Sequence, residues 1–488
     1  MKQRLRDVIF VLPGTTGSVL SRGGTPVWDA SHRLLGKSLV QRRRAVQDLA
    51  LDGGPLTAEA LMPQASLVAG LFKVDGYSRL TQALASHFDV RHAVAAGTRA
   101  LPPSNLIEFP YDWRLDNRVT AARLATVAER ALADWRAHAN VPDAQLIFVA
   151  HSMGGLIARY FLDVLGGHRL TRALVSIGTP FGGSLDALGY LANGYRKGHL
   201  DLTDVMRTFP SVHQLLPVEA VVHDATATAA TGNRTPLRIA EAGPVTGVDP
   251  KLAADAELFH EEIAEGAKAL ADAGSRYAVL PVVGTHQLTW QSAVYDGSGV
   301  SLGRDLPAGV HRYFGSGDRD GDGTVGISSA APADPLNVYA DVFQAEKHAS
   351  LHNNPHVLHT LLGRLTRMQA RLQPQLRGPE PVVVSGQLAL GVDVEDHYAG
   401  DEPVVVQAEV FAPGRPEKVT AVAEHTGSGE LRAVDLVPAA DGEGAGGRWR
   451  AELHGLAAGV YRLEVGAGGT TVLPPPVHDL FEVGGTGA

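Results

Sequence analysis

A serine between a buried apolar run and a helical pattern constrains this chain most. An apolar stretch over 146–149 leads into Ala-His-Ser-Met-Gly-Gly over 150–155, and an apolar helical pattern follows over 156–162. Ala150 and Gly154, two residues before and after the serine, let a strand double back into a helix without a side-chain collision. The serine of such a turn adopts a strained backbone that its neighbours hold in place. The pattern predicts a reactive serine at the end of a buried strand.

The sequence around this turn alternates apolar strands with helical segments. Strands are expected at 7–12, 145–150, 173–178 and 277–283, and a helix over 120–139. Such alternation predicts α/β structure, in which a parallel sheet carries helices on both faces. Sites in these sheets lie beyond the carboxyl ends of the strands. A serine turn at such an end is typical of an α/β-hydrolase, which is the expected fold class.

The predicted hydrolase domain covers residues 1–372. Residues 30–75 and 185–265 are long, mixed in pattern and interrupted by proline, so we expect a lid and a cap insertion there. A proline-rich segment over 373–381 predicts a linker. Short alternating strands separated by turn residues then predict a small all-β sandwich over 382–488 as an accessory domain.

Composition excludes several functions. The 488 residues include no cysteine, so disulfides, thiolate metal sites and a cysteine nucleophile are excluded. A formal net charge of −9 argues against nucleic acid as a partner. No apolar stretch approaches the roughly 20 residues of a membrane helix. The first apolar run is too short for a signal peptide. We therefore expect a cytoplasmic protein whose contact with membranes, for a lipid substrate, is transient.

A serine hydroxyl becomes a nucleophile when a histidine takes its proton and a carboxylate orients that histidine. In α/β-hydrolases the chain order is serine, acid, histidine, so the partners of Ser152 are expected downstream. A loop with aspartates at alternate positions supplies the acid, for which Asp322 is the first choice and Asp320 the second. His348 lies in a polar segment after the last apparent strand and is the expected base.

Other interpretations of these segments compete. The aspartate loop resembles the start of a calcium loop, but a bidentate glutamate would be needed where Ser329 stands, so neither a metal nor a cofactor is expected. Pro355 interrupts any single helix through the later histidines. These are expected to face solvent or cap a helix: His352, His356 and His359. His151 is expected to be structural, with its ring pointing away from the serine.

The negative charge that develops on an ester oxygen needs backbone N–H groups aimed at it. Met153, directly after the serine, is expected to supply one. The glycine-rich loop over 13–18 is expected to supply the other, with Thr15 as the donor. A phosphate-binding loop would need Gly-Lys-Ser or Gly-Lys-Thr, which this loop lacks.

Five motifs within residues 8–350 resemble segments of one known family. They are the loop over 12–18, Phe-Pro-Tyr-Asp-Trp-Arg over 109–114, the serine segment over 150–155, Gly-Thr-Pro-Phe-Gly-Gly-Ser over 178–184, and Asp-Gly-Asp-Gly-Thr-Val over 320–325. The family is that of lecithin:cholesterol acyltransferase, which includes lysosomal phospholipase A2 and phospholipid:diacylglycerol acyltransferase. The resemblance implies acyl-ester chemistry on lipids, with the acid role at Asp322 and the base role, by position, at His348.

The resemblance also implies substrate-binding roles. Trp28 is similar to a tryptophan at the edge of the family's lid, and Tyr111 and Trp113 belong to its most specific motif. Within that motif, Asp112 and Arg114 are suited to a buried ion pair, and a scaffold role for the motif competes with substrate contact. Members from secretory compartments hold their lid with a disulfide. This chain has no cysteine, so the resemblance implies nothing about substrate access.

The leading functional hypothesis is serine-dependent chemistry on a lipid ester. Water as acceptor gives a lipase or phospholipase, and an alcohol gives an O-acyltransferase. One alternative is a carboxylesterase or lactonase for small molecules. Another is a non-catalytic, hydrolase-like binding module. In either case the β-sandwich is a candidate for docking a protein partner.

Overall fold

A seven-stranded parallel sheet organises the first two thirds of the chain. The computed structural model describes residues 2–29, 48–67, 73–197, 200–225, 235–242, 244–274, 277–307, 310, 320–332, 342–370, 388–412, 414–439, 447–469 and 474–485. The strand order is β19-β16-β12-β11-β2-β10-β9, and every neighbouring pair is parallel. The bounds, in that order, are Val342–Ala345, Ala278–Thr285, Thr171–Ile177, Leu146–His151, Val8–Leu12, Leu106–Glu108 and His92–Val94. The central strands β2 and β11 are buried at every position, as continuous apolar runs predict.

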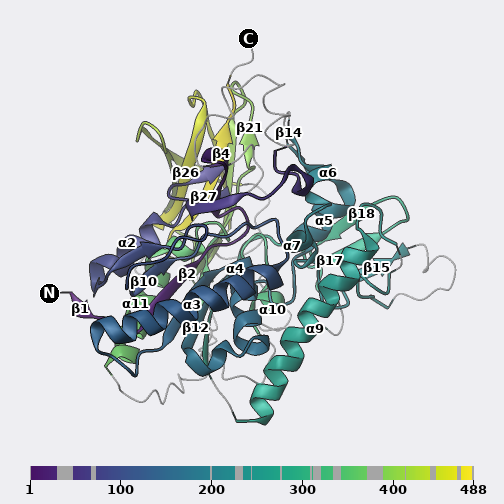
Figure 1. Ribbon diagram of the computed structural model, residues 1–488. Helices are drawn as coiled ribbons and strands as arrows, with labels where there is room; N and C mark the ends of the chain where they lie inside the picture. Colours follow the sequence, from purple (N-terminus) through teal and green to yellow (C-terminus); the bar gives the residue numbers. More distant parts are fainter. Residues whose placement is uncertain are drawn as a thin grey trace.

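Helices cover both faces of this sheet (Figure 1). Helix α3 (Asn117–Ala139) packs with α4 (Met153–Arg159), and α2 (Ser78–His87) packs with α11 (Pro355–Gln369). Asp116 caps α3 by accepting a hydrogen bond from Arg118 N–H. The predicted α/β-hydrolase fold is thus confirmed. None of the described helices combines the length and apolar character of a membrane span.

The cap insertion is a separate layer beside the carboxyl ends of the strands. It contains α5 (Leu185–Asn193), α6 (Thr203–Met206), α7 (Pro210–His213) and α9 (Pro250–Asp272). A small sheet adds β15 (Val222–Asp224), β17 (Ser292–Tyr295) and β18 (Val300–Gly303). The cap layer therefore reaches past the expected end at residue 265, because β15 pairs with a strand from the region after β16.

The expected lid over 30–75 is described only in part, since 30–47 and 68–72 lie outside the described residues. Its strand β5 (Thr57–Leu61) pairs with β3 (Ser18–Arg22), which also pairs with β4 (Thr25–Trp28). Short elements complete this half of the chain. They are β1 (Gln3–Arg4) with β8 (Phe88–Asp89), β6 (Ser66–Leu67) with β7 (Lys73–Val74), β13 (Arg196–Lys197) with β14 (Leu200–Asp201), and α10 (Ile327–Ala330).

The C-terminal region is an eight-stranded sheet that curls on itself around its own apolar core. The order is β20-β22-β25-β24-β23-β26-β27-β21, with bounds Ala389–Asp393, Val404–Phe411, Arg448–Leu453, Leu431–Pro438, Lys418–His425, Gly459–Gly468, Val477–Val483 and His397–Tyr398. Only the end of β24 pairs with β25, so the sheet forms two layers, as the predicted sandwich requires. The linker expected at 373–381 and the strand expected at 382–384 lie outside the described residues.

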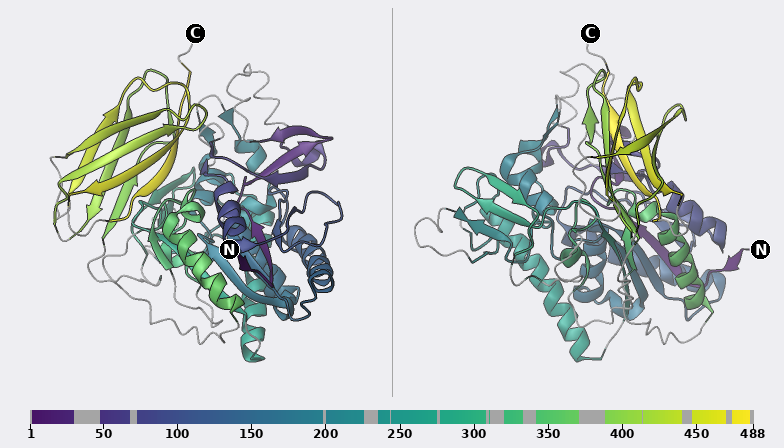
Figure 2. Two further views of the ribbon diagram at one scale, coloured as in Figure 1. Left: turned by 90° about the vertical axis from the view of Figure 1, so that its left-hand side faces the viewer. Right: turned by 180° about the vertical axis from the view of Figure 1, so that it is seen from behind.

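The C-terminal sheet docks on the hydrolase layers through buried charges. Glu346, which is fully buried, accepts hydrogen bonds from the backbone N–H and the Nδ1 of His478 on β27, at 2.7 and 2.8 Å. Gln287 donates to the carbonyl of Leu390 and accepts from Val392 N–H. The cap and the C-terminal sheet lie on two sides of the upper end of the molecule in the view of Figure 1 (Figures 1 and 2).

This interface predicts a stability effect. Glu346→Ala strands the buried donors of His478 and is expected to lower the thermal midpoint by roughly 5 °C, because unpaired buried polar groups are costly. Glu464 also faces His478, at 3.4 Å, but is exposed, so Glu464→Ala is the matched control. Differential scanning fluorimetry measures both, and equal midpoints would contradict this account of the interface.

Candidate active site

Ser152 lies on the turn between β11 and α4 with φ 52° and ψ −128°, a strained conformation for a residue other than glycine. Glycines make this turn possible. A Cβ on Gly154 would lie 2.5 Å from the carbonyl oxygen of Pro13, and one on Gly155 would lie 2.0 Å from Thr179 Oγ1. Gly14 approaches from the opposite loop so closely that a Cβ there would lie 2.7 Å from the Cβ of Ser152. The turn is held between two loops that leave no room for side chains.

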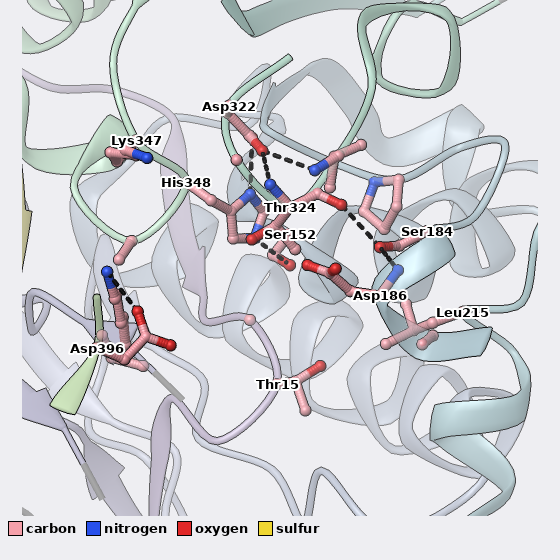
Figure 3. Close-up of a pocket in the computed structure, with 18 of the residues that line it drawn as sticks. Thr15, Ser152, Ser184, Asp186, Leu215, Asp322, Thr324, Lys347, His348 and Asp396 are labelled. Carbon is pink, nitrogen blue, oxygen red and sulfur yellow. Dashed lines mark hydrogen bonds and ion pairs between the residues drawn. The ribbon is translucent and has the colours of Figure 1, made fainter. Parts of the chain in front are cut away.

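The structure brings Ser152, His348 and Asp322 together in one hydrogen-bonded row (Figure 3). Ser152 Oγ lies 2.9 Å from His348 Nε2, and His348 Nδ1 lies 2.7 Å from Asp322 Oδ2. The other carboxylate oxygen of Asp322 accepts from Thr324 and Val325 N–H groups, which fixes its plane. Asp320 instead accepts from Gln291 Nε2 at 3.2 Å, so it is not the histidine's partner.

The charges around His348 make it a stronger base. Burial by itself lowers the pKa of His348, but the charge and hydrogen bond of Asp322, with a further contribution from the charge of Asp186, outweigh it and raise the pKa above its ordinary value. Asp186 lies in the first turn of α5, lines the same pocket, and its carboxylate points toward Ser152 (Figure 3). No motif in the sequence marks Asp186.

The two amides expected to receive an oxyanion lie beside Ser152. Met153 is the first residue of α4, so its N–H has no acceptor within the helix. Thr15 lines the pocket together with Ser152, and its hydroxyl lies 3.5 Å from the Met153 sulfur. These positions are compatible with the predicted donor roles. The loop that carries Thr15 is itself fixed by Tyr111, whose hydroxyl donates to the Pro13 carbonyl at 2.7 Å.

The three aromatic residues expected to bind substrate lie behind this loop. Trp28, Tyr111 and Trp113 are almost fully buried, and none of them is among the residues that line the pocket at Ser152. Trp28 donates to the Thr16 carbonyl at 3.0 Å and packs edge-to-face on Trp113. The placement favours the scaffold role, while contact with substrate stays a prediction.

The predicted ion pair of the same motif is present and buried. Arg114 pairs with Asp112 at 2.6 Å and also donates to the carbonyls of Leu49 and Ala50. It therefore joins the expected lid segment over 30–75 to the motif. For metal binding, no group of three candidate ligands occurs among the described residues, to which Asp318 of the aspartate loop does not belong.

A buried chain of hydrogen bonds links the glycine-rich loop over 13–18, named the oxyanion loop after its predicted role, to the histidine loop, residues 346–349. Gly14 N–H donates to the Tyr77 hydroxyl at 2.8 Å, Tyr77 bonds His151 Nδ1 at 2.9 Å, and His151 Nε2 bonds the His348 carbonyl at 3.1 Å. Burial lowers the pKa of His151, which favours the neutral ring. With Nε2 donating to the carbonyl, Nδ1 accepts from Tyr77. The expectation that this ring points away from the site was wrong, because it packs 5.0 Å from the ring of His348.

One of the later histidines also departs from expectation. His352 is fully buried rather than solvent-facing, because it lies in a 3₁₀ turn (Leu351–Asn353) under Tyr77. It bonds the Gly76 carbonyl at 2.8 Å and stacks on the Tyr77 ring. Burial lowers its pKa to about 4, so it is neutral near pH 7. His356 and His359 lie on α11, and both are exposed, as predicted.

The pocket at Ser152 has a volume of about 290 Å³ and two unlike walls. The cap helices give a largely apolar wall: Ala187, Tyr190, Met206, Val212 and Leu215. The other wall is charged, and the C-terminal region takes part in it: Lys73, Lys347, Asp393, Asp396 and Asp479. Sequence reasoning missed this second wall, because no local pattern marks residues that meet only when two distant parts of the chain pack together.

Residues 70–242 match the model of the lecithin:cholesterol acyltransferase family. The predicted family resemblance is confirmed for this span. The span holds the 109–114, 150–155 and 178–184 motifs, whereas the oxyanion and aspartate loops lie outside it. A search among curated proteins finds no match.

Solved structures with some similarity include a lipase, BlEst2, from Bacillus licheniformis. Its mature form has 11% sequence identity and a TM-score of 0.32, covering 75% of this chain and 94% of that chain. Its propeptide form has 9% identity and a TM-score of 0.32, covering 99% and 94%.

The Tyr77 chain predicts a kinetic effect. Tyr77→Phe removes the acceptor of Gly14 N–H and the donor to His151, so the oxyanion loop and the histidine loop lose their connection. We expect kcat on a p-nitrophenyl ester to fall about tenfold with KM changed by less than about twofold. Tyr398→Phe, which removes a buried hydroxyl in the C-terminal sheet, is the control. An equal loss of activity in both variants would mean that general destabilisation is responsible.

The charge of Asp186 predicts a pH effect. A neighbouring negative charge favours protonated His348, whereas the base role predicted for His348 requires the neutral ring. Asp186→Asn is therefore expected to lower the pKa of His348 and to move the acid limb of the kcat/KM profile to lower pH. Asp204→Asn, at an exposed position of α6, is the matched control and should leave the limb in place. A shift to higher pH in Asp186→Asn would contradict the assignment.

Proposed function

We propose that this protein is a serine-dependent hydrolase or O-acyltransferase of lipid esters. The observation that carries the proposal is the row from Ser152 through His348 to Asp322, with contacts of 2.9 and 2.7 Å, at a pocket with one apolar wall. The family match over 70–242 supports acyl chemistry on lipids as the reaction class.

In the proposed reaction, Ser152 Oγ attacks the ester carbonyl carbon while His348 Nε2 takes the hydroxyl proton. The N–H groups of Thr15 and Met153 stabilise the oxyanion, and Asp322 stabilises the imidazolium. The C–O bond to the alcohol then breaks, His348 protonates the leaving oxygen, and an acyl-serine forms. Water or a second alcohol, deprotonated by His348, attacks the acyl-serine. The bond from the acyl carbon to Ser152 Oγ then breaks, and His348 returns the proton to Ser152 Oγ.

A carboxylesterase for short esters is the second candidate. The pocket of about 290 Å³ favours it, since this volume lies at the lower limit of small-molecule sites. A series of p-nitrophenyl esters from butyrate to palmitate separates the two candidates. A lipid enzyme keeps or gains kcat/KM as the chain lengthens, and a short-ester enzyme loses it.

The nucleophile is tested by Ser152→Ala. We expect release of fatty acid from phospholipid micelles and from p-nitrophenyl butyrate to fall by a factor of about 10³ or more. A fluorophosphonate probe should label the wild-type protein and fail to label the variant. Retained hydrolysis in the variant would refute the proposal. Lack of both labelling and hydrolysis in the wild type would favour a non-catalytic binding module.

The acyl acceptor is tested in the same assay. Adding an aliphatic alcohol to the phospholipid mixture diverts acyl groups into a new ester if the acyl-serine admits alcohols. Mass spectrometry of the lipid extract then distinguishes the transferred product from free fatty acid.

A further inference from the structure

The C-terminal sheet contributes side chains to the pocket of Ser152, although the sequence presents it as an accessory domain. Four of its residues line the pocket together with Ser152 and His348. Asp393 is the last residue of β20, Val394 and Asp396 follow that strand, and Asp479 belongs to β27. The wall is anchored. Lys73 bridges Asp396 at 2.7 Å and Asp479 at 2.8 Å, so a residue from the hydrolase half ties this wall in place.

The close approach of the two halves is built into the backbone. A Cβ on Gly391 would lie 2.7 Å from the carbonyl oxygen of His286, so β20 reaches the hydrolase layers at a distance that only glycine permits. Gln287 bonds the backbone on both sides of this glycine, at Leu390 and Val392. Asp393 is therefore held at the rim by its own strand.

The chemistry of ester cleavage assigns the two walls. His348 protonates the leaving alcohol, so the alcohol departs on the side of the histidine. Lys347 adjoins His348, lies 3.9 Å from Asp479, and belongs to the charged wall. Leu215 and Asp396 lie on opposite sides of the Ser152–His348 pair (Figure 3). An acyl chain suits the apolar wall of the cap helices, which leaves the charged wall for the alcohol half of the ester.

We propose that the C-terminal sheet forms the subsite for the alcohol half of the ester, and that Asp393 makes this subsite unfavourable for anionic alcohol groups. Within this wall, the carboxylates of Asp393, Asp396 and Asp479 outnumber the ammonium groups of Lys73 and Lys347. Lys73 is committed to two of these carboxylates, whereas Asp393 is exposed at the rim. A group with a positive charge is attracted there, and a net negative one is repelled. This inference rests on the proposed ester chemistry.

The test is a charge reversal at the rim in the full-length protein. Asp393→Lys and wild type are compared on two short-chain phospholipids of equal acyl length, one zwitterionic and one anionic, below their micelle concentrations. Monomeric substrates remove any effect of surface charge on binding to an interface. We expect the ratio of kcat/KM, zwitterionic over anionic, to fall at least about fivefold in Asp393→Lys and less in Asp393→Asn.

Glu395→Lys is the matched control. Glu395 lies two residues further on, is exposed, and does not line the pocket, so the same change in net charge should leave the ratio unchanged. An unchanged ratio in Asp393→Lys, or an equal change in Glu395→Lys, overturns the subsite while the ester chemistry stands. A wild type that cleaves p-nitrophenyl butyrate but neither phospholipid also overturns it. A wild type inactive on every ester refutes the proposed function, and this inference with it.

Discussion

The site depends on how one short segment, residues 346–349, is held from both sides. Glu346 is bound by His478 of the C-terminal sheet, and the next residues carry Lys347 into the charged wall and His348 between Ser152 and Asp322. His348 N–H also donates to the Asp322 carbonyl at 2.8 Å, so the backbone and the ring of this residue share a partner. An imidazole with two ring contacts under 3 Å keeps that geometry only when its backbone is fixed, and here the fixing groups come from both halves of the chain.

The opposite side of the site is fixed by steric closeness rather than by charge. Gly14 and Gly154 leave no room for a Cβ between the oxyanion loop and the serine turn, and Gly155 leaves none between that turn and Thr179. Strain at Ser152 persists because these contacts and the buried strand β11 surround it. The Tyr77–His151 chain then joins this rigid side to the histidine segment. Acyl transfer requires a fixed distance between the oxyanion donors and the base. The hydrogen bonds through Tyr77 and His151 hold the two loops that carry these groups at such a distance.

Sequence reasoning succeeded where the signal is local. The apolar runs predicted the central strands, because a strand buried on both faces consists of consecutive apolar residues. Gly154 predicted the turn, because a side chain two residues after the serine would collide with the backbone there. Chain order and loop chemistry predicted Asp322 and His348 as partners of Ser152, and the structure places the three side chains within hydrogen-bond distance, while their catalytic roles stay a prediction. The sequence-based predictions were wrong for His151 and His352. Both side chains contact Tyr77, and His352 also bonds Gly76, and these two residues lie far from both histidines in the chain. Asp186, Lys73 and Asp393 carry no local mark at all, since their importance arises only from tertiary packing.

The C-terminal sheet has a core of its own and also lines the pocket at Ser152. Its alternating strands indicate an independent unit with its own core, and the structure contains that core. Yet β27 is buried at all seven positions, so the face turned away from that core is covered as well. Leu480 packs with Ala65 of the N-terminal half, and Asp479 and Glu346 are fully buried at the junction. Separating the halves would expose apolar surface, leave Lys73 without Asp396 and Asp479, and leave His478 without Glu346. A charged residue buried at such a junction favours one docked arrangement, and that arrangement is the one that completes the pocket at Ser152.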